Sequence, residues 1–68
     1  MPTIEQLHKE LDALPDQMRG TVAGYRVVRS GNHYQATHTD GAHTSWWKAG
    51  TLASILYQWK RIAYTLEG

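Results

Sequence analysis

Residues 25–48, with the sequence YRVVRSGNHYQATHTDGAHTSWWK, set the architecture of the chain. Two reverse-turn signals, Gly31-Asn32 and Asp40-Gly41, divide this stretch, and the residues beside them are rich in valine, tyrosine, threonine and tryptophan, which favour strands. Short turns of this kind join antiparallel strands. We therefore expect three strands over about residues 22–30, 33–39 and 42–48, paired as an antiparallel meander.

Alternation along these strands separates two faces of the sheet. If both turns have two residues, one face carries Tyr25, Val27, Tyr34, Ala36, His38, His43, Ser45 and Trp47, and the other carries Arg26, Val28, Gln35, Thr37, Thr39, Thr44 and Trp46. The first face is the more apolar one, and we expect it to be buried. Because side chains alternate with period two, a shift of one residue at either turn would exchange the faces of a strand.

Helices are predicted before and after the strands. Thr3 and Gln6 have the spacing of a capping box and Pro15 ends the pattern, which predicts a helix over about residues 3–14. After the strands, Thr51 can cap a helix over about residues 51–66. Each helix has an apolar stripe at three- and four-residue spacing: Ile4, Leu7, Leu11 and Leu14 in the first, and Leu52, Ile55, Leu56, Trp59, Ile62, Ala63 and Leu66 in the second. The predicted fold is α+β with the order α-β-β-β-α, and both helices pack on one face of the sheet.

Length and composition limit the chain to one domain. With 68 residues it has room for one hydrophobic core, so residues 1–68 are expected to form a single domain. It has no cysteine and hence no disulfide, and small domains without such links often gain stability from a partner. No signal-peptide pattern or long apolar run is present, which predicts a cytoplasmic protein without a membrane span. Residues 1–16 carry a net charge of −3 and residues 17–68 a net charge of +4, so an acidic helix precedes a mildly basic body.

Catalytic and metal-binding patterns are missing from the sequence. His38 and His43 would face each other across the Asp40-Gly41 turn, but two imidazoles do not make a zinc site, and no third ligand stands at a typical spacing. There is no cysteine nucleophile, no nucleophile elbow around a serine and no glycine-rich phosphate loop. We therefore expect a non-enzymatic protein that needs no metal and no cofactor.

The more polar face of the predicted sheet is the first candidate for a binding surface. Arg26, Gln35, Thr37 and Trp46 lie on it, and Arg29 and Lys48 lie near its edge. Such a surface offers positive charge, hydrogen-bond donors and acceptors, and one aromatic plane, with which a sheet can contact phosphates and bases. An exposed threonine-rich face would look similar without any ligand. This face predicts a small nucleic-acid-associated module that contacts DNA, as an accessory or regulatory protein of a phage or mobile element does.

A protein-binding role is the alternative. Exposed tryptophan such as Trp46 is enriched at interaction sites, and the polar side of the second helix places Tyr57, Lys60, Arg61 and Tyr64 next to one another. The same side chains would also be ordinary on a solvated helix. On this interpretation the chain is an inhibitor or adaptor that binds a host protein, or a second copy of itself as a homodimer.

Features over residues 25–66 occur in a recognisable order. They are Tyr25-Arg26-Val27-Val28-Arg29, Tyr34-Gln35-Ala36, the Asp40-Gly41 turn, Trp47 and a long alanine-containing helix. This order resembles AP2-type and integrase arm-binding domains, which lay a three-stranded sheet in the DNA major groove and brace it with a C-terminal helix. The resemblance implies that Arg26, Arg29, Gln35 and Thr37 contact DNA, with Trp46 beside them. The α-β-β-β-α order is also similar to the double-stranded-RNA-binding domain, but that family's lysine cluster is replaced here by Lys48-Ala49-Gly50-Thr51-Leu52-Ala53.

Overall fold

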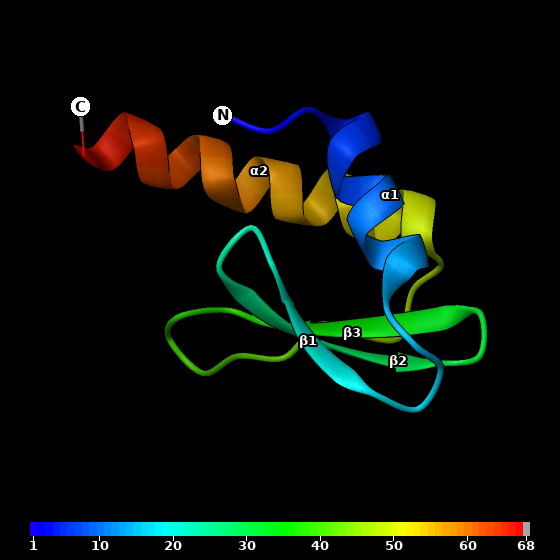
Figure 1. Cartoon of the computed structure of the whole chain (residues 1–68). Coiled ribbons are helices and arrows are strands. Elements are labelled where there is room, and N and C mark those ends of the chain that lie inside the picture. The colour runs from blue at the N-terminus through cyan, green and yellow to red at the C-terminus, as the bar shows by residue number, and fades with distance from the viewer. Residues whose placement is uncertain (68) are drawn as a thin grey trace.

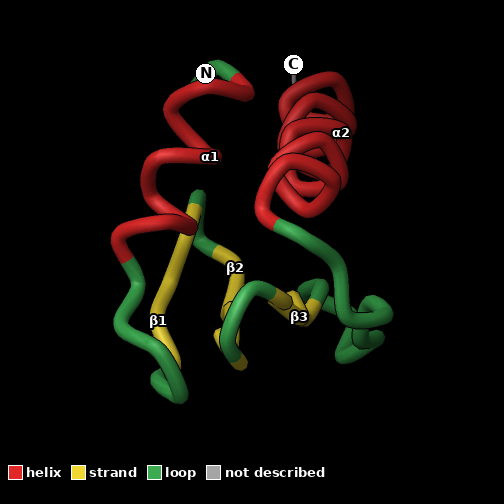
Figure 2. Tube along the Cα trace, turned by 90° about the vertical axis from the view of Figure 1, so that its right-hand side faces the viewer, coloured by secondary structure: helices red, strands yellow, loops and turns green. Residues whose placement is uncertain are grey.

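The computed structural model of the chain describes residues 1–67, and Gly68, the last residue of the predicted domain, lies outside the described residues. Its elements are α1 (Ile4–Ala13), β1 (Arg19–Val22), β2 (Tyr25–Ser30), β3 (His33–Thr37) and α2 (Ala49–Glu67). The strands form one antiparallel sheet in the order β1-β2-β3. Both helices lie on one side of this sheet, as Figure 1 and Figure 2 show from two directions. The predicted α+β class and α-β-β-β-α order are confirmed.

The core lies between the two helices and the sheet. Leu7 and Leu11 of α1 and Leu52 and Leu56 of α2 are fully buried there. The strands contribute the side chains that point toward the helices, which are Val22, Tyr25, Val27, Tyr34 and Ala36, and all of them are buried. For residues 25–36 the buried face is therefore the one that alternation predicts.

α1 begins and ends as the sequence predicts. The Gln6 N–H donates to the Thr3 hydroxyl at 3.1 Å, and the Thr3 N–H donates to the Gln6 side-chain oxygen at 2.8 Å, which completes the capping box. At the other end, Leu14 has an extended backbone (φ −67°, ψ 131°). Pro15 disfavours helical geometry in the residue before it, so the helix ends at Ala13.

α2 begins earlier than predicted and reaches farther than the core. Its first residue is Ala49, so Thr51 lies inside the first turn and is not the cap. Ile62 and Leu66, which belong to the predicted apolar stripe, are 55% and 83% exposed. In Figure 1 the last turns of α2, drawn in red, extend past the ends of the strands. No helix within residues 1–67 is both long and apolar enough to cross a membrane.

The first predicted strand is in fact two strands. A tight turn at Ala23 and Gly24 interrupts residues 22–30, and Val22 pairs with Tyr25 across it. Both turn residues have positive φ, 54° and 85°, as a type I′ hairpin turn requires. Alanine rarely adopts this conformation, so the turn is inconspicuous in the sequence. β1 is therefore a strand that the sequence-based prediction did not contain.

The prediction of a third strand over residues 42–48 is wrong. This segment makes only two isolated bridges with β3, one between Thr37 and His43 and one between Tyr34 and Trp47. The two bridges differ in register by one residue, so no continuous ladder can join them. Trp47, predicted to be buried, is 42% exposed.

The register change starts at the Asp40-Gly41 turn. The His38 N–H donates to the Ala42 carbonyl at 2.9 Å, so the loop has three residues and not two, and Gly41 has a φ of 92°. Three-residue hairpin loops commonly end in such a left-handed glycine. The extra residue pairs His43 with Thr37. The prediction that His43 faces His38 is therefore wrong.

Candidate nucleic-acid interface

The face of the sheet turned away from the helices carries two rows of mainly polar side chains. One row crosses the strands from Thr21 through Arg26 to Thr37, and the other crosses from Arg19 through Val28 to Gln35. Neighbouring strands lie about 4.8 Å apart, and neighbouring rows on one face lie about 6.6–6.8 Å apart along the strands. We call this surface the open face; it consists of Arg19, Thr21, Arg26, Val28, Gln35, Thr37 and His43.

The open face surrounds a shallow hollow of about 550 Å³. At one side of it, the Thr37 hydroxyl and the His43 Nδ1 atom form a hydrogen bond of 3.0 Å, which fixes the imidazole against β3. The Gln35 side-chain amide donates to the Thr44 carbonyl at 3.1 Å. The segment after β3 is thus held beside β3 by side chains as well as by backbone hydrogen bonds of Thr44 and Trp47, although it is not a strand.

The open face carries positive charge that residues 1–67 do not neutralise. Arg19 and Arg26 are exposed, and none of the described residues that line the hollow carries a carboxylate. Within the described part of the chain neither guanidinium group makes a hydrogen bond or an ion pair. The two groups are diagonal neighbours on adjacent strands, with Cα atoms about 7–8 Å apart in such a pair. They can therefore contact one anionic ligand together.

Arg29, predicted as a nucleic-acid contact, lies on the opposite face. Its Nη1 atom donates to the Leu14 carbonyl at 2.6 Å and to the Asp12 carbonyl at 3.3 Å, and its Nε atom donates to the Gly31 carbonyl at 2.9 Å. The guanidinium group therefore binds one carbonyl in the last turn of α1 and that of Leu14, which follows the helix, and it fixes this end of α1 to the β2–β3 turn. Alternation along β2 explains the placement, because Arg26 and Arg29 are an odd number of residues apart.

The other predicted contacts are distributed unevenly. Arg26, Gln35 and Thr37 do lie together on the open face. Trp46 is 45% exposed, as predicted, but it does not line the hollow. Lys48 lines a separate pocket beside the first residues of α2.

Sequence reasoning missed Arg19, Thr21 and His43. The first two belong to β1, where exposed residues alternate with Gly20 and the buried Val22. That alternation was visible in the sequence, but no recognisable turn signal followed it. His43 was placed on the wrong face because of the three-residue loop.

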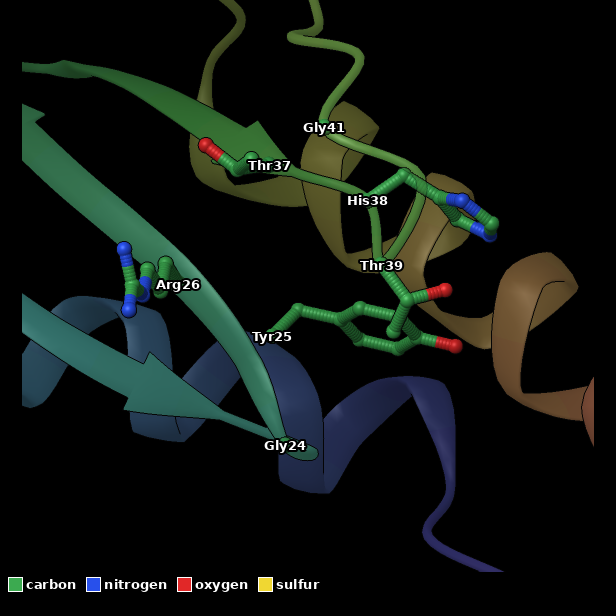
Figure 3. A pocket seen from close by; sticks show the side chains of 7 residues that line it. All are labelled: Gly24, Tyr25, Arg26, Thr37, His38, Thr39 and Gly41. Carbon is green, nitrogen blue, oxygen red and sulfur yellow. The ribbon is translucent and has the colours of Figure 1, made fainter.

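A second hollow lies at the end of the sheet and shares two residues with the open face. Its volume is about 340 Å³, and both Arg26 and Thr37 line it. Figure 3 shows the side chains of Arg26 and Tyr25 pointing to opposite sides of the strand. Tyr25 and His38 also line this hollow. The Tyr25 ring stacks on His38, with 5.9 Å between ring centroids, and meets Trp59 edge-on at 5.2 Å. The aromatic cluster closes this end of the core.

The residues predicted for protein binding lie along α2. The Lys60 Nζ atom lies 5.9 Å from the Tyr25 ring centroid and 5.8 Å from the Tyr64 ring centroid, so it is shared between the two rings. Tyr64 is 47% exposed, and Arg61 is also exposed. Tyr57 is half-buried and lines a hollow together with the N-terminal residues 1–5.

Two carboxylates secure the loops at the ends of the sheet. The Gly31 N–H donates to Asp16 at 2.6 Å, and this bond lowers the pKa of the Asp16 carboxyl below its usual value. The Ala42 N–H donates to Asp40 at 2.8 Å and lowers the pKa of Asp40 in the same way. No group of three or more metal-ligating side chains comes together in residues 1–67.

No protein-family model matches the chain, and comparisons with curated proteins and with solved structures find no match either. The resemblance to AP2-type and integrase arm-binding domains therefore stays a prediction. Of the four contacts that it implies, Arg26, Gln35 and Thr37 share the open face and Arg29 does not.

Proposed function

We propose that this protein binds nucleic acid through the open face of its sheet. The observation that carries the proposal is the pair of exposed, unneutralised guanidinium groups of Arg19 and Arg26 on a face without carboxylates. Arginine forms two parallel hydrogen bonds to a phosphate, so this pair suits a phosphodiester backbone. Hydroxyl groups such as those of Thr21 and Thr37 also bind phosphates, and the Gln35 amide can contact a base edge.

The proposal is tested by titrating a fluorescently labelled DNA duplex with the protein at several salt concentrations. Binding should weaken as salt rises, because each neutralised phosphate releases counterions, with a slope of about 0.9 in log K per log salt for each phosphate. Arg26→Gln and Arg19→Gln should each weaken binding for all sequences and each reduce the slope by about 1. A single-stranded DNA and an RNA duplex, titrated in parallel, identify the preferred form.

Lys9→Gln is the matched control, because it removes one positive charge from α1, on the other side of the sheet. It should leave both the affinity and the salt slope unchanged. Absence of binding to any of the three nucleic acids at low salt would contradict the proposal. An equal loss in Lys9→Gln would also contradict it, because binding would then depend on net charge and not on the open face.

A protein-binding role is the second candidate, and the exposed end of α2 favours it. Tyr64 and Arg61 lie there beside Ile62 and Leu66, whose exposure is high for large apolar side chains. A second copy of the chain is the simplest partner to test. Sedimentation velocity over a range of concentrations should detect a dimer, and Leu66→Ser should dissociate it. A strict monomer at all concentrations would contradict self-association through this end.

A further inference from the structure

A pocket of about 480 Å³ lies on the helix side of the sheet, where the end of α1 meets the start of α2. Tyr34 of β3 lines it, together with Lys48, Gly50 and Thr51. The open face and the hollow at the end of the sheet do not include these residues. The pocket is therefore a separate site, and its argument does not depend on nucleic-acid binding by the open face.

The first residues of α2, Ala49, Gly50 and Thr51, line this pocket. The Leu52 N–H donates to the Lys48 carbonyl at 3.0 Å, which is the first bond of the helix. In the part of the chain that the structure describes, the N–H groups of Ala49, Gly50 and Thr51 have no acceptor, and no side chain caps the helix. α2 has 19 residues, so the partial positive charge at its N-terminus is fully developed. Such an end attracts anions.

The Tyr34 hydroxyl is a second, independent donor, and it has no hydrogen-bond partner among the described residues. Tyr34 is only 2% exposed, and its ring packs in the core with the Arg29 guanidinium 5.5 Å from the ring centroid. No fully enclosed side-chain oxygen of the described residues lacks a hydrogen bond, so the hydroxyl still reaches solvent, and Tyr34 meets solvent at this pocket. Burial raises the pKa of Tyr34, which keeps the hydroxyl protonated as a donor.

The charges around the pocket favour an anion. Lys48 contributes an exposed ammonium group, and the Arg29 guanidinium is fixed nearby by its bonds to backbone carbonyls. One carboxylate, that of Asp12, also lines the pocket. The His8 Nε2 atom lies 3.5 Å from it and offsets its charge when protonated. Positive groups thus outnumber the single negative one.

We propose that this pocket binds the terminal phosphate of a phosphate monoester. A terminal phosphate offers three acceptor oxygens and close to two negative charges, which match the N–H groups of α2, the Lys48 ammonium and the Tyr34 hydroxyl. A carboxylate has two oxygens and one charge and would leave some of these donors unpaired. A phosphodiester has only two free oxygens on each phosphate and fits the same donors less well.

The direct test is a titration of ¹⁵N-labelled protein with inorganic phosphate, followed by the backbone amide resonances. The amides of residues 49–52 should shift the most. Lys48→Gln and Tyr34→Phe should each weaken phosphate binding, the latter by about tenfold, as expected for one hydrogen bond to a charged group. Because the hydroxyl has no hydrogen-bond partner within residues 1–67, Tyr34→Phe should not lower the melting temperature. Acetate at the same concentration should shift these amides much less.

Lys9→Gln is again the matched control, because it removes a positive charge from α1 outside the pocket. It should bind phosphate as the unmodified chain does. Shifts that are absent from residues 49–52, or that persist unchanged in both Lys48→Gln and Tyr34→Phe, would overturn the proposal. So would equal shifts with acetate and phosphate.

Two further titrations identify the source of the monoester. A short oligonucleotide with a 5′-phosphate should shift the amides of residues 49–52, whereas the same oligonucleotide with a 5′-hydroxyl should not. A nucleoside monophosphate tests the free small molecule in the same way. These readouts are distinct from those of the open face, where the amides of Arg19 and Arg26 report binding. Either site can therefore fail without affecting the result for the other.

Discussion

The two faces of the sheet are built from alternate residues of the same three strands, yet they differ in almost every physical property. On the covered face, Val22, Val27 and Ala36 are buried beneath the leucines of both helices. On the open face, Arg19 and Arg26 make no contact that would neutralise their charge within residues 1–67. The covered face therefore stabilises the fold, whereas residues of the open face can be substituted without unfolding the protein.

The two arginines of β2 show how strict this division is. Arg26 points to the open face and is exposed, whereas Arg29 points to the covered face and donates three hydrogen bonds to backbone carbonyls. The chemical group is the same in both residues. Its surroundings make one a candidate ligand contact and the other a structural link between α1 and the sheet.

Leu56→Ala should have the largest effect on stability. The Leu56 side chain is fully buried, and removing such a side chain costs about 2–5 kcal/mol. That is a large part of the total stability of a small domain, which is about 5 kcal/mol at the low end. Urea unfolding followed by circular dichroism measures the loss. Thr21→Ala on the open face is the comparison, and a similar loss there would mean that the open face also carries the fold.

The arginine pair should separate stability from binding. Arg29→Gln should lower the free energy of unfolding by about 1.5–3 kcal/mol, because charge-assisted hydrogen bonds to the end of α1 are lost. Arg29→Lys keeps the charge but not the planar group with several donors, so it should recover only part of the loss. Arg26→Gln should change stability by less than about 0.5 kcal/mol, as surface substitutions usually do. Equal unfolding midpoints for Arg26→Gln and Arg29→Gln would contradict the assignment of Arg29 to the stability of the fold and of Arg26 to binding.

Val27 and Val28 allow the same comparison with an almost isosteric change. Val27→Thr places a hydroxyl group in the buried face and should lower the free energy of unfolding by about 1–3 kcal/mol, because the buried hydroxyl loses its hydrogen bonds to water. Val28→Thr adds the same group to the half-exposed open face, where the cost should be below about 0.5 kcal/mol. Thermal unfolding of the two variants in one buffer gives the difference directly. A larger loss of stability in Val28→Thr than in Val27→Thr would show that Val28, and not Val27, faces the helices.

The division into faces was predictable over the part of the sheet whose turn obeys a simple rule. Gly31 supplies the positive φ, 61°, that a two-residue turn needs, so the register of β2 against β3 follows from the sequence. From that register come the buried Tyr34 and the outward Gln35. The bounds of α1 were predictable for a similar reason, because Thr3, Gln6 and Pro15 are local signals that tertiary contacts did not override. The start of α2 was not, because Thr51 resembles a cap but lies inside the first turn.

The errors arise where local signals are weak or equivocal. Nothing in Ala23-Gly24 distinguishes a type I′ turn from an extended segment, so β1 and the contribution of Arg19 were missed. Asp40-Gly41 is compatible with loops of two and of three residues. The third residue shifts the register and places His43 on the opposite face of the sheet from the predicted one. The pocket at the start of α2 joins residues from α1, β3 and the end of the loop. Such a site depends on tertiary packing and has no signature in the sequence.

The smallest expected effect concerns the two carboxylates that hold the loops at either end of the sheet. Asp16 accepts the Gly31 N–H and so joins the α1–β1 connection to the β2–β3 turn, whereas Asp40 accepts the N–H of Ala42 within its own loop. The pKa of each is lowered in the folded protein, chiefly by that backbone bond. A lowered pKa means that the stabilisation is present above the unfolded value of 3.8 and is lost as the pH falls through the folded pKa.

Asp16→Asn should therefore lower the melting temperature at neutral pH, and the difference from the unmodified chain should shrink as the pH falls below 3.8. Asp40→Asn should behave in the same way with a smaller amplitude, because its bond spans only two residues and fixes no distant segment. Melting curves recorded by circular dichroism between neutral and acid pH measure both differences. A melting-temperature difference that stays constant over the whole pH range would contradict this prediction, because it would show that the effect of the substitution does not depend on the charge of the carboxylate. The Asp16–Gly31 hydrogen bond would then stabilise the β2–β3 turn without any contribution from the ionisation of Asp16.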